Sequence, residues 1–251
     1  MKNNFCKKRD KPVTRSWFNH WSNEYDRTLG SISFHRELLG LVVRNSGVKN
    51  GYKILDIGCG TGLLSLKLLR KTNCSIAGVD YSDEMIGIFK DKIKKLKLDD
   101  RVSVSLMDAY SLKFKKETFD KVVSSVALHH LKDKLPALKK IFSILKPGGA
   151  LIIGEIDMDA TGKHNDIKRL KRILRVLEQE WIPALRDVGV EAFSKMFENG
   201  KKHILNEGEY CLSLRQWSNL CRKAGFRPVI IKRVPRHRCF GIIIAKKPLV
   251  D

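Results

Sequence analysis

The stretch ILDIGCGTG, from Ile54 to Gly62, decides the fold that we expect for this chain of 251 residues. An apolar run is followed by three glycines at alternate positions, and a helical pattern of leucines begins at Leu63. Glycines at such a turn let the backbone bend tightly and approach a ligand closely. The spacing Gly58-x-Gly60-x-Gly differs from the Gly-x-Gly-x-x-Gly of dinucleotide sites, and the Walker lysine is missing, so a phosphate cradle is disfavoured.

Strand-like and helix-like segments alternate outward from this turn. The sequence predicts strands at 53–57, 75–79, 102–106, 121–125, 150–156, 229–234 and 240–245. Helical patterns lie between them at 63–70, 83–96, 135–145 and 214–224, and Pro147-Gly148-Gly149 is expected to stop the third of these helices. The alternation favours an α/β fold with a doubly wound, mostly parallel, seven-stranded sheet whose last strand is antiparallel. Such sheets bind ligands at the carboxyl ends of their strands.

Four regions follow from this reading. We expect a basic tail over residues 1–15 and an N-terminal helical cap in the rest of 1–50. Residues 51–157 should form the α/β core, 158–213 a helical lid insertion, and 214–251 the last helix and the closing strand pair. Within the insertion, helical spacing predicts a packed apolar stripe of Ile167, Leu170, Leu174, Leu177 and Trp181. The stripe is flanked by a basic face, either solvated or a recruiting surface, of Lys168, Arg169, Lys171, Arg172 and Arg175.

The charge of the chain is strongly positive. Lys and Arg number 49 against 27 Asp and Glu, a net charge of +22, and residues 215–247 hold ten basic residues and no acidic one. Such a field attracts polyanions, including RNA, acidic proteins and anionic metabolites, although a solvated lysine-rich surface explains the same composition.

Hydropathy and cysteine spacing bear on the compartment. Apolar runs stay well short of the roughly 20 residues that cross a bilayer, and the first 15 residues are polar. The six cysteines show neither a CxxC pair nor a zinc spacing. We therefore expect a cytoplasmic protein with reduced thiols, without a membrane span and without a metal site.

Two carboxylates follow the next two strands. Asp80 ends the second strand, where a carboxylate accepts two hydrogen bonds from vicinal ribose hydroxyls or, alternatively, caps a helix. Asp108 follows the third strand, where it can accept from an adenine amino group while the small Ala109 leaves room for the ring. Taken alone, Asp108 is an ordinary turn residue.

Together these features resemble the class I S-adenosylmethionine-dependent methyltransferases, in particular their ubiquinone/menaquinone branch. The likeness rests on motifs at 56–62, 80, 108–109, 119–131 and 145–149, in the family's order. It implies S-adenosyl-L-methionine as the cofactor, contacted by Asp56, Gly58, Gly60, Thr61, Asp80, Tyr81, Asp108, Ala109 and Ser125. In that branch an N-terminal helix with a Tyr-Asp pair often closes over the site. Tyr25-Asp26 fits this pattern and makes Tyr25 a candidate catalytic residue, with core packing as the alternative.

The chemistry needs few catalytic groups. The sulfonium already activates the methyl group, so the nucleophile must lie in line behind it at roughly 3 Å, and a base is needed only if the nucleophile loses a proton. Candidate bases follow the fourth and fifth strands, namely His130 and Glu155, with His129, His164 and His203 weaker.

The expected function is methyl transfer to a small molecule or an exposed side chain. Methylation of amide or exocyclic amino nitrogens is disfavoured because residues 124–127 read SSVA instead of the Asn/Asp-Pro-Pro-aromatic motif. Carbon-5 methylation of pyrimidines needs a nucleophilic cysteine, and none lies between Cys74 and Cys211. Two alternatives remain: an RNA methyltransferase docked through 215–247, and a non-catalytic cofactor-binding subunit. The acceptor and the oligomeric state are left open.

Overall fold

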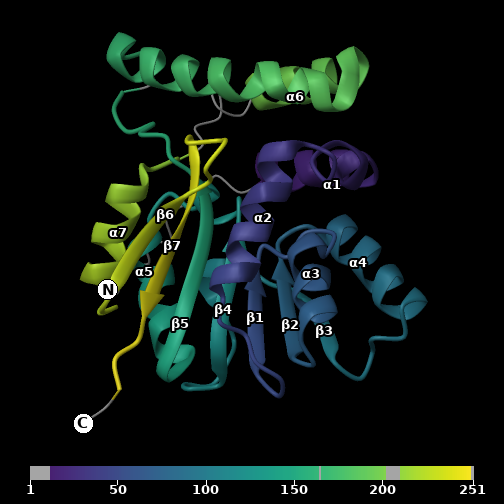
Figure 1. Ribbon diagram of the computed structural model, residues 1–251, viewed down its shortest axis with the longest axis vertical. Coiled ribbons are helices and arrows are strands. Elements are labelled where there is room, and N and C mark those ends of the chain that lie inside the picture. Colours follow the sequence, from purple (N-terminus) through teal and green to yellow (C-terminus); the bar gives the residue numbers. More distant parts are fainter. Residues whose placement is uncertain (1–11, 164, 202–209, 250–251) are drawn as a thin grey trace, which may run out of the picture.

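The computed structural model describes residues 12–163, 165–201 and 210–249. These residues form a seven-stranded sheet in the order β3-β2-β1-β4-β5-β7-β6, in which β7 runs antiparallel to both of its neighbours and the other pairs are parallel (Figure 1). The strands are β1 (Lys53–Ile57), β2 (Ser75–Asp80), β3 (Val102–Leu106), β4 (Phe119–Ser125), β5 (Leu145–Ile156), β6 (Val229–Arg233) and β7 (Phe240–Lys246). The predicted mostly parallel, seven-stranded sheet is confirmed.

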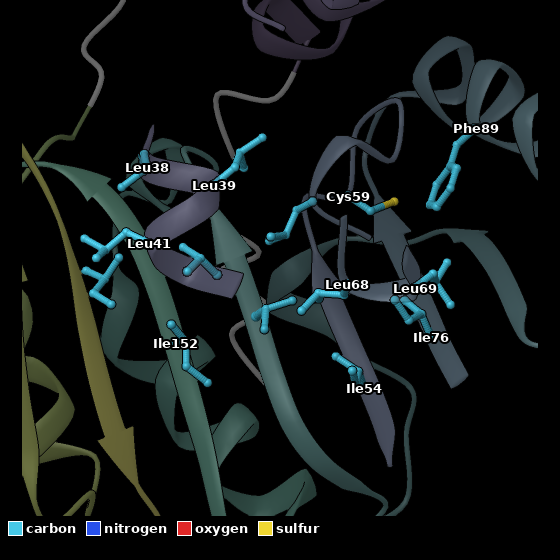
Figure 2. Packing of buried hydrophobic residues seen from close by; sticks show 14 of the residues in the cluster. Leu38, Leu39, Leu41, Ile54, Cys59, Leu68, Leu69, Ile76, Phe89 and Ile152 are labelled. Carbon is cyan, nitrogen blue, oxygen red and sulfur yellow. The ribbon is translucent and has the colours of Figure 1, made fainter. Parts of the chain in front are cut away.

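Helices cover both faces of the sheet. One face is covered by α2 (Ser33–Asn45), α3 (Leu63–Lys71) and α4 (Asp83–Lys95), and the other by α5 (Lys134–Ile144) and α7 (Leu214–Lys223). On the first face, Leu38 of α2 and Leu68 of α3 pack with Ile54 and Ile152 of the sheet (Figure 2). On the second face, the fully buried Trp217 packs with residues of α5 and β5. The sheet is thereby held between two apolar layers that leave the strand ends for a site.

One predicted helix end is confirmed and another is wrong. Ser82 accepts a hydrogen bond from the backbone nitrogen of Met85 at 3.2 Å, which confirms it as the N-cap of α4. Helix α5 instead ends at Ile144, and β5 begins at once. The Pro147-Gly148-Gly149 triplet therefore lies inside β5, where the register against β4 shifts, and does not stop the helix.

The N-terminal region contains two helices, α1 (Pro12–Thr28) and α2. Residues 12–15 were expected to belong to the tail, but they are helical. Proline is well suited to the first turn of a helix, and α1 begins at Pro12. The remainder of the expected tail, residues 1–11, lies outside the described residues. Helix α2 packs in the same core as the sheet, whereas α1 contacts α4 and α6 at the end where the parallel strands terminate (Figure 1).

Helix α6 (Ile167–Lys201) crosses that end of the molecule and is kinked at Gly189. The packed stripe predicted for it is wrong at two positions, because Ile167 is 67% exposed and Leu174 is 53% exposed. The buried side carries Ile173 and Leu177 together with Arg169, which is 3% exposed. The side chain of Trp181 lies outside the described residues.

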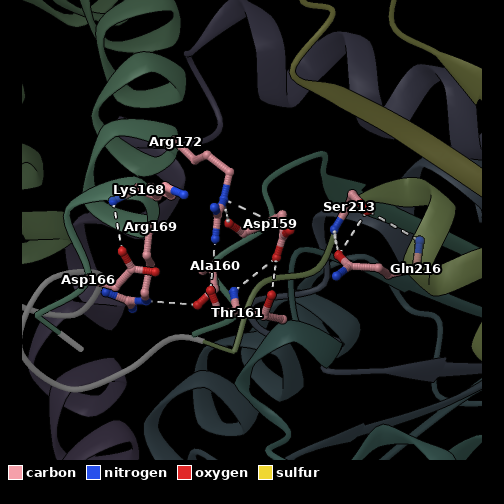
Figure 3. Close-up of polar contacts among 9 residues, drawn as sticks. All are labelled: Asp159, Ala160, Thr161, Asp166, Lys168, Arg169, Arg172, Ser213 and Gln216. Carbon is pink, nitrogen blue, oxygen red and sulfur yellow. Dashed lines mark hydrogen bonds and ion pairs between the residues drawn. The ribbon is translucent and has the colours of Figure 1, made fainter. Parts of the chain in front are cut away.

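Polar bonds explain the rotation of α6. The Nε of Arg169 donates to the carbonyl oxygen of Ala160 at 2.8 Å, and the Nε of Arg172 donates to that of Asp159 at 2.9 Å (Figure 3). These bonds turn part of the predicted basic face toward the protein, and part of the apolar stripe toward solvent.

Among the described helices, none combines the length and the apolar composition that a bilayer crossing requires. Five cysteines are free thiols, and Cys6 lies outside the described residues.

Candidate functional site

A cavity lies at the carboxyl ends of β1, β2 and β4. Strand order reverses between β1 and β4, and ligands bind at such switch points in parallel sheets. Helix α1 closes one side of the cavity with Phe18 and Tyr25. The lining includes most of the residues that the sequence pointed to, namely Tyr25, Gly58, Gly60, Asp80, Tyr81, Asp108, Ala109, Ser125 and His130.

The glycine turn forms the floor of this cavity. Gly58 has φ of +70°, and a Cβ there would come within 2.3 Å of the Ala127 Cβ, so a larger residue does not fit. Gly60 has φ of +51°, and a Cβ there would meet no described atom within 4 Å. The backbone at Gly60 therefore faces open space, as a close approach to a ligand requires.

The Asp80 side chain is hydrogen-bonded to the glycine turn. Its Oδ2 accepts a hydrogen bond from the backbone nitrogen of Gly60 at 2.8 Å, and its Oδ1 accepts from that of Ser82 at 2.9 Å. Burial raises the pKa of this carboxyl above its usual value, and the bonds from Ser82 and Gly60 oppose that rise. A carboxylate offers about four lone-pair positions, so Asp80 can accept from a further donor.

Asp108 closes the turn after β3. Its Oδ1 accepts from the backbone nitrogen of Tyr110 at 2.9 Å and caps the short 3-10 helix η1 (Ala109–Ser111). This is the ordinary turn role, and the same residue also lines the cavity. The neighbouring Met107 and Tyr110 line it too, although sequence reasoning assigned them no role. Their position beside Asp108 was the only signal for them.

Asp56 and Thr61 lie in a smaller cavity that shares Tyr25, Gly58, Gly60 and Ser125 with the first. Asp56 is 1% exposed and accepts from the Ser65 hydroxyl at 2.7 Å. Burial raises its pKa to about 7, against the lowering effect of the Ser65 bond.

Replacing Asp56 by Asn should change how stability depends on pH. The pKa of about 7 in the folded protein exceeds the ordinary value of 3.8. The stability that this carboxyl contributes is therefore fully present below the lower value and is lost as pH rises through the higher one. Relative to Asp56→Asn, the wild type should lose roughly 2–3 kcal/mol of unfolding free energy between about pH 5 and pH 9. Urea titrations measure the difference, with the exposed Asp91→Asn as control. A difference that stays constant with pH would contradict the raised pKa.

A polar cluster joins α1 to the glycine turn and to α4. Asp26 accepts from the Thr61 hydroxyl and from the Lys92 Nζ, and the Lys92 Nζ also donates to the Thr61 carbonyl oxygen at 2.8 Å. Burial raises the pKa of the Tyr25 phenol, so that it stays protonated at neutral pH. The sequence pointed to Tyr25-Asp26 but missed Lys92 and Phe18, whose contributions depend on the packing of α1.

The candidate bases separate into different environments. His130 lines the cavity, and its ring meets that of Phe18 edge-on at 5.2 Å. Glu155 is fully buried and does not line the cavity; its Oε2 lies 2.8 Å from the Nδ1 of His129. The backbone nitrogen of His129 also donates to Glu155 at 3.2 Å. The weaker candidates His164 and His203 lie outside the described residues.

The lining fits a sulfonium nucleoside. Asp80 offers acceptors for the ribose, Gly58 and Gly60 leave room for close approach, and Ala109 leaves room beside Asp108. The buried Ser125 hydroxyl, which lines both cavities, has no hydrogen-bond partner among the described residues. A buried unpaired hydroxyl carries an energetic cost that a bound polar ligand would remove.

Val126, next to Ser125, adopts a positive φ of +51°. Left-handed backbone is strained for a β-branched residue and is concentrated at functional sites. Its backbone nitrogen donates to the Gly154 carbonyl oxygen at 2.8 Å, which holds this conformation.

Known proteins resemble the chain in sequence. A family model described as a methyltransferase domain matches residues 48–217. The demethylmenaquinone methyltransferase of Staphylococcus aureus (strain MRSA252) is 32% identical over 149 residues, which cover 58% of this chain and 61% of that protein. Methyltransferase GfsG of Streptomyces halstedii is 32% identical over 114 residues, covering 45% and 41%. The matches thus span less than two thirds of these relatives.

Solved structures share the fold. A Haemonchus contortus phosphoethanolamine N-methyltransferase 2, solved with phosphomonomethylethanolamine and S-adenosylhomocysteine, superposes with a TM-score of 0.67 at 19% identity, covering 93% of this chain and 60% of that one. The [4+2]-cyclase SpnF superposes with a TM-score of 0.61 at 19% identity, covering 94% and 96%. The family match over most of the core, on a sheet with this strand order, shows that the chain belongs to the class I S-adenosylmethionine-dependent methyltransferases.

Proposed function

We propose that this protein transfers a methyl group from S-adenosylmethionine to a small-molecule nucleophile by in-line displacement. The observation that carries the proposal is the cavity at the switch point, where the glycine turn, Asp80 and the Asp108-Ala109 pair face one space. Its closure by Phe18 and Tyr25 of α1 favours a small acceptor over an exposed protein side chain.

The residues have separable roles in this proposal. Asp80 binds the ribose, Asp108 and Ala109 border the adenine, and Gly58, Gly60 and Ser125 border the amino-acid portion. The bound cofactor supplies an activated methyl group. The chain then positions the acceptor in line with it, excludes water with α1, and accepts a proton where the acceptor carries one.

Two side chains border the part of the cavity that α1 closes. Tyr25 stays protonated because of its raised pKa, so it donates a hydrogen bond and does not act as a base. His130 lines the cavity with an imidazole, the side chain that most often serves as a general acid or base in enzymes, which makes it the candidate to accept a proton. Phe18, Met107 and Leu131 add apolar surface for the acceptor. The relative from Staphylococcus aureus, a demethylmenaquinone methyltransferase, is consistent with a partly apolar acceptor of this kind.

The test follows the methyl group. The protein is incubated with S-adenosylmethionine labelled in the methyl group and with fractionated cell extract, and the label is located in metabolites, protein or RNA. Label in a metabolite fraction supports the proposal. Label that enters RNA or protein alone contradicts it, and cofactor binding without any transfer indicates a non-catalytic subunit. The extract is prepared from the cytoplasm, because that is the compartment expected for this protein.

Replacing His130 by Ala should reduce kcat by about 100-fold or more if it accepts the proton, because a positioned general base contributes roughly 10²–10⁴. The affinity for S-adenosylmethionine, measured by calorimetry, should stay unchanged. Turnover is measured with the acceptor found by labelling. Unchanged kcat would reduce His130 to a packing role against Phe18.

A further inference from the structure

The solvent-facing side of α6 carries aliphatic side chains that no described part of the protein covers. Ile167, Leu174 and Ile182 are 67%, 53% and 63% exposed. At about 100° per residue, they fall within a sector of roughly 80° on the helix. The buried Ile173 and Leu177 lie on the other side. Large aliphatic side chains aligned on a solvated helix indicate a contact surface.

Basic side chains lie in this sector or beside it. Lys168, Lys171 and Arg175 are exposed and lie within one helical turn of the aliphatic residues. Glu178 is exposed in the same sector. We name the set Ile167, Lys168, Lys171, Leu174, Arg175 and Ile182 the α6 outer face.

The basic residues of α6 thus serve two different purposes. Arg169 and Arg172 turn toward the protein, where their guanidinium groups bind backbone carbonyl oxygens of residues 159–161 (Figure 3). These bonds set the rotation of the helix and thereby present the outer face to solvent. The hydrogen bonds of Arg169 and Arg172 thus fix the start of α6, and with it the orientation of the outer face.

The connection between β6 and β7 carries positive charge on the opposite side of the helix. The Nδ1 of His237 lies 3.1 Å from the Glu180 Oε2 on the inner side of α6, which places the connection against the helix. Arg236 and Arg238, on either side of the buried His237, are exposed. Because the contact is on the inner side, these two cations are not part of the outer face.

We propose that the α6 outer face binds an anionic lipid surface. Lysine and arginine attract anionic headgroups, while aliphatic side chains insert at the boundary of headgroups and acyl chains. The face lies along one end of the molecule and outside the sheet (Figure 1), a placement suited to a flat surface. It is also the end at which the cavity lies, so the bound protein would hold its cavity toward the bilayer.

Two other occupants fit the face less well. Single-stranded RNA binds basic surfaces through bases stacked on aromatic side chains, whereas the exposed apolar side chains that the structure describes on this face are aliphatic. A second copy of the chain would place this basic face against another basic face, in a protein of net charge +22.

The experiment is co-sedimentation of the whole protein with vesicles of phosphatidylcholine, or of equal parts of phosphatidylcholine and phosphatidylglycerol. Partitioning should be strong for the anionic vesicles, weak for the neutral ones, and lower at high salt. K168E/K171E/R175E should reduce it by roughly 100-fold, since each cation near an anionic surface contributes about fivefold. I167S/L174S/I182S should reduce it by about tenfold or more. Matched controls are K94E/K95E and L106S, which change exposed residues far from α6.

Several outcomes would overturn the proposal. One is that the wild type binds neutral and anionic vesicles equally. Another is that it binds neither. A third is that the α6 variants bind anionic vesicles as well as the wild type does, whatever the control variants do. Light scattering that shows a dimer abolished by I167S/L174S/I182S would assign the face to a second copy. Loss of RNA binding in the charge variant, with no vesicle binding by the wild type, would assign it to RNA. The affinity of each variant for S-adenosylmethionine is also measured by calorimetry. A protein that binds the cofactor but no vesicles contradicts the lipid proposal alone and leaves the proposed methyltransferase function intact.

Discussion

Replacing Asp80 by Ala should weaken the binding of S-adenosylmethionine by roughly 10- to 150-fold. Hydrogen bonds to a charged group contribute about 1.5–3 kcal/mol each, and the Asp80 carboxylate is placed to accept from the ribose hydroxyls. The same oxygens already accept from the backbone nitrogens of Gly60 and Ser82. The alanine variant therefore also loosens the glycine turn, which acts in the same direction. Calorimetry with the cofactor and with S-adenosylhomocysteine measures the loss.

Two controls separate binding from folding. Asp80→Asn keeps one side-chain acceptor and should lose less affinity than Asp80→Ala. The exposed Asp100→Ala should leave affinity unchanged. Because burial raises the Asp80 pKa, cofactor affinity of the wild type should also fall at acidic pH as the carboxylate gains a proton. Affinity unchanged in Asp80→Ala would remove this residue from the cofactor site.

Replacing Glu155 by Leu should lower the free energy of unfolding by about 3 kcal/mol. Glu155 is fully buried, and the change leaves the Nδ1 and the backbone nitrogen of the buried His129 without their acceptor. An unpaired buried polar group costs roughly 1–3 kcal/mol, and breaking a buried ion pair about 3–5. Urea unfolding followed by far-UV circular dichroism measures the loss.

The double variant His129→Leu/Glu155→Leu tests the cause. Removing both polar partners should restore part of the stability, since apolar replacement of a buried pair is often neutral. The control Glu117→Gln alters an ion pair with Lys247 in which the glutamate side chain is 52% exposed, and it should change stability by less than about 1 kcal/mol. If Glu155→Leu costs no more than Glu117→Gln, the pair does not support the turn that carries His130.

Most of the fold could be predicted because its signals are local. Apolar runs of strand length, the N-cap Ser82 and the short connection before β7 each act within a few residues. The site follows for the same reason, since in parallel sheets the residues after successive strands meet at one edge. Gly58, Gly60, Asp80 and Asp108 are brought together in this way.

The parts that the sequence missed depend on contacts between distant elements. Phe18 reaches the cavity because α1 is held to α4 and to the glycine turn. Asp26 binds Lys92 and Thr61, and Asn19, next to Phe18, bonds to the start of α4. Glu155 interrupts an apolar strand, which suggested a base, but a neighbouring turn places His129 over it. Strand position alone could not distinguish a group that faces the cavity from one that faces the core.

Short-range signals were sufficient to predict the sheet, its glycine turn and the acid that ends β2, because backbone propensity and the side-chain alternation of strands act within a few residues. Contacts between distant elements set which side of α6 meets water. Periodicity showed an apolar stripe, yet the bonds of Arg169 to Ala160 and of Glu180 to His237 rotate the helix, burying charged residues and exposing Ile167 and Leu174. Pairing a buried charged group with a hydrogen-bond partner can contribute more free energy than burying one aliphatic side chain. Only the fold determines where such a partner lies.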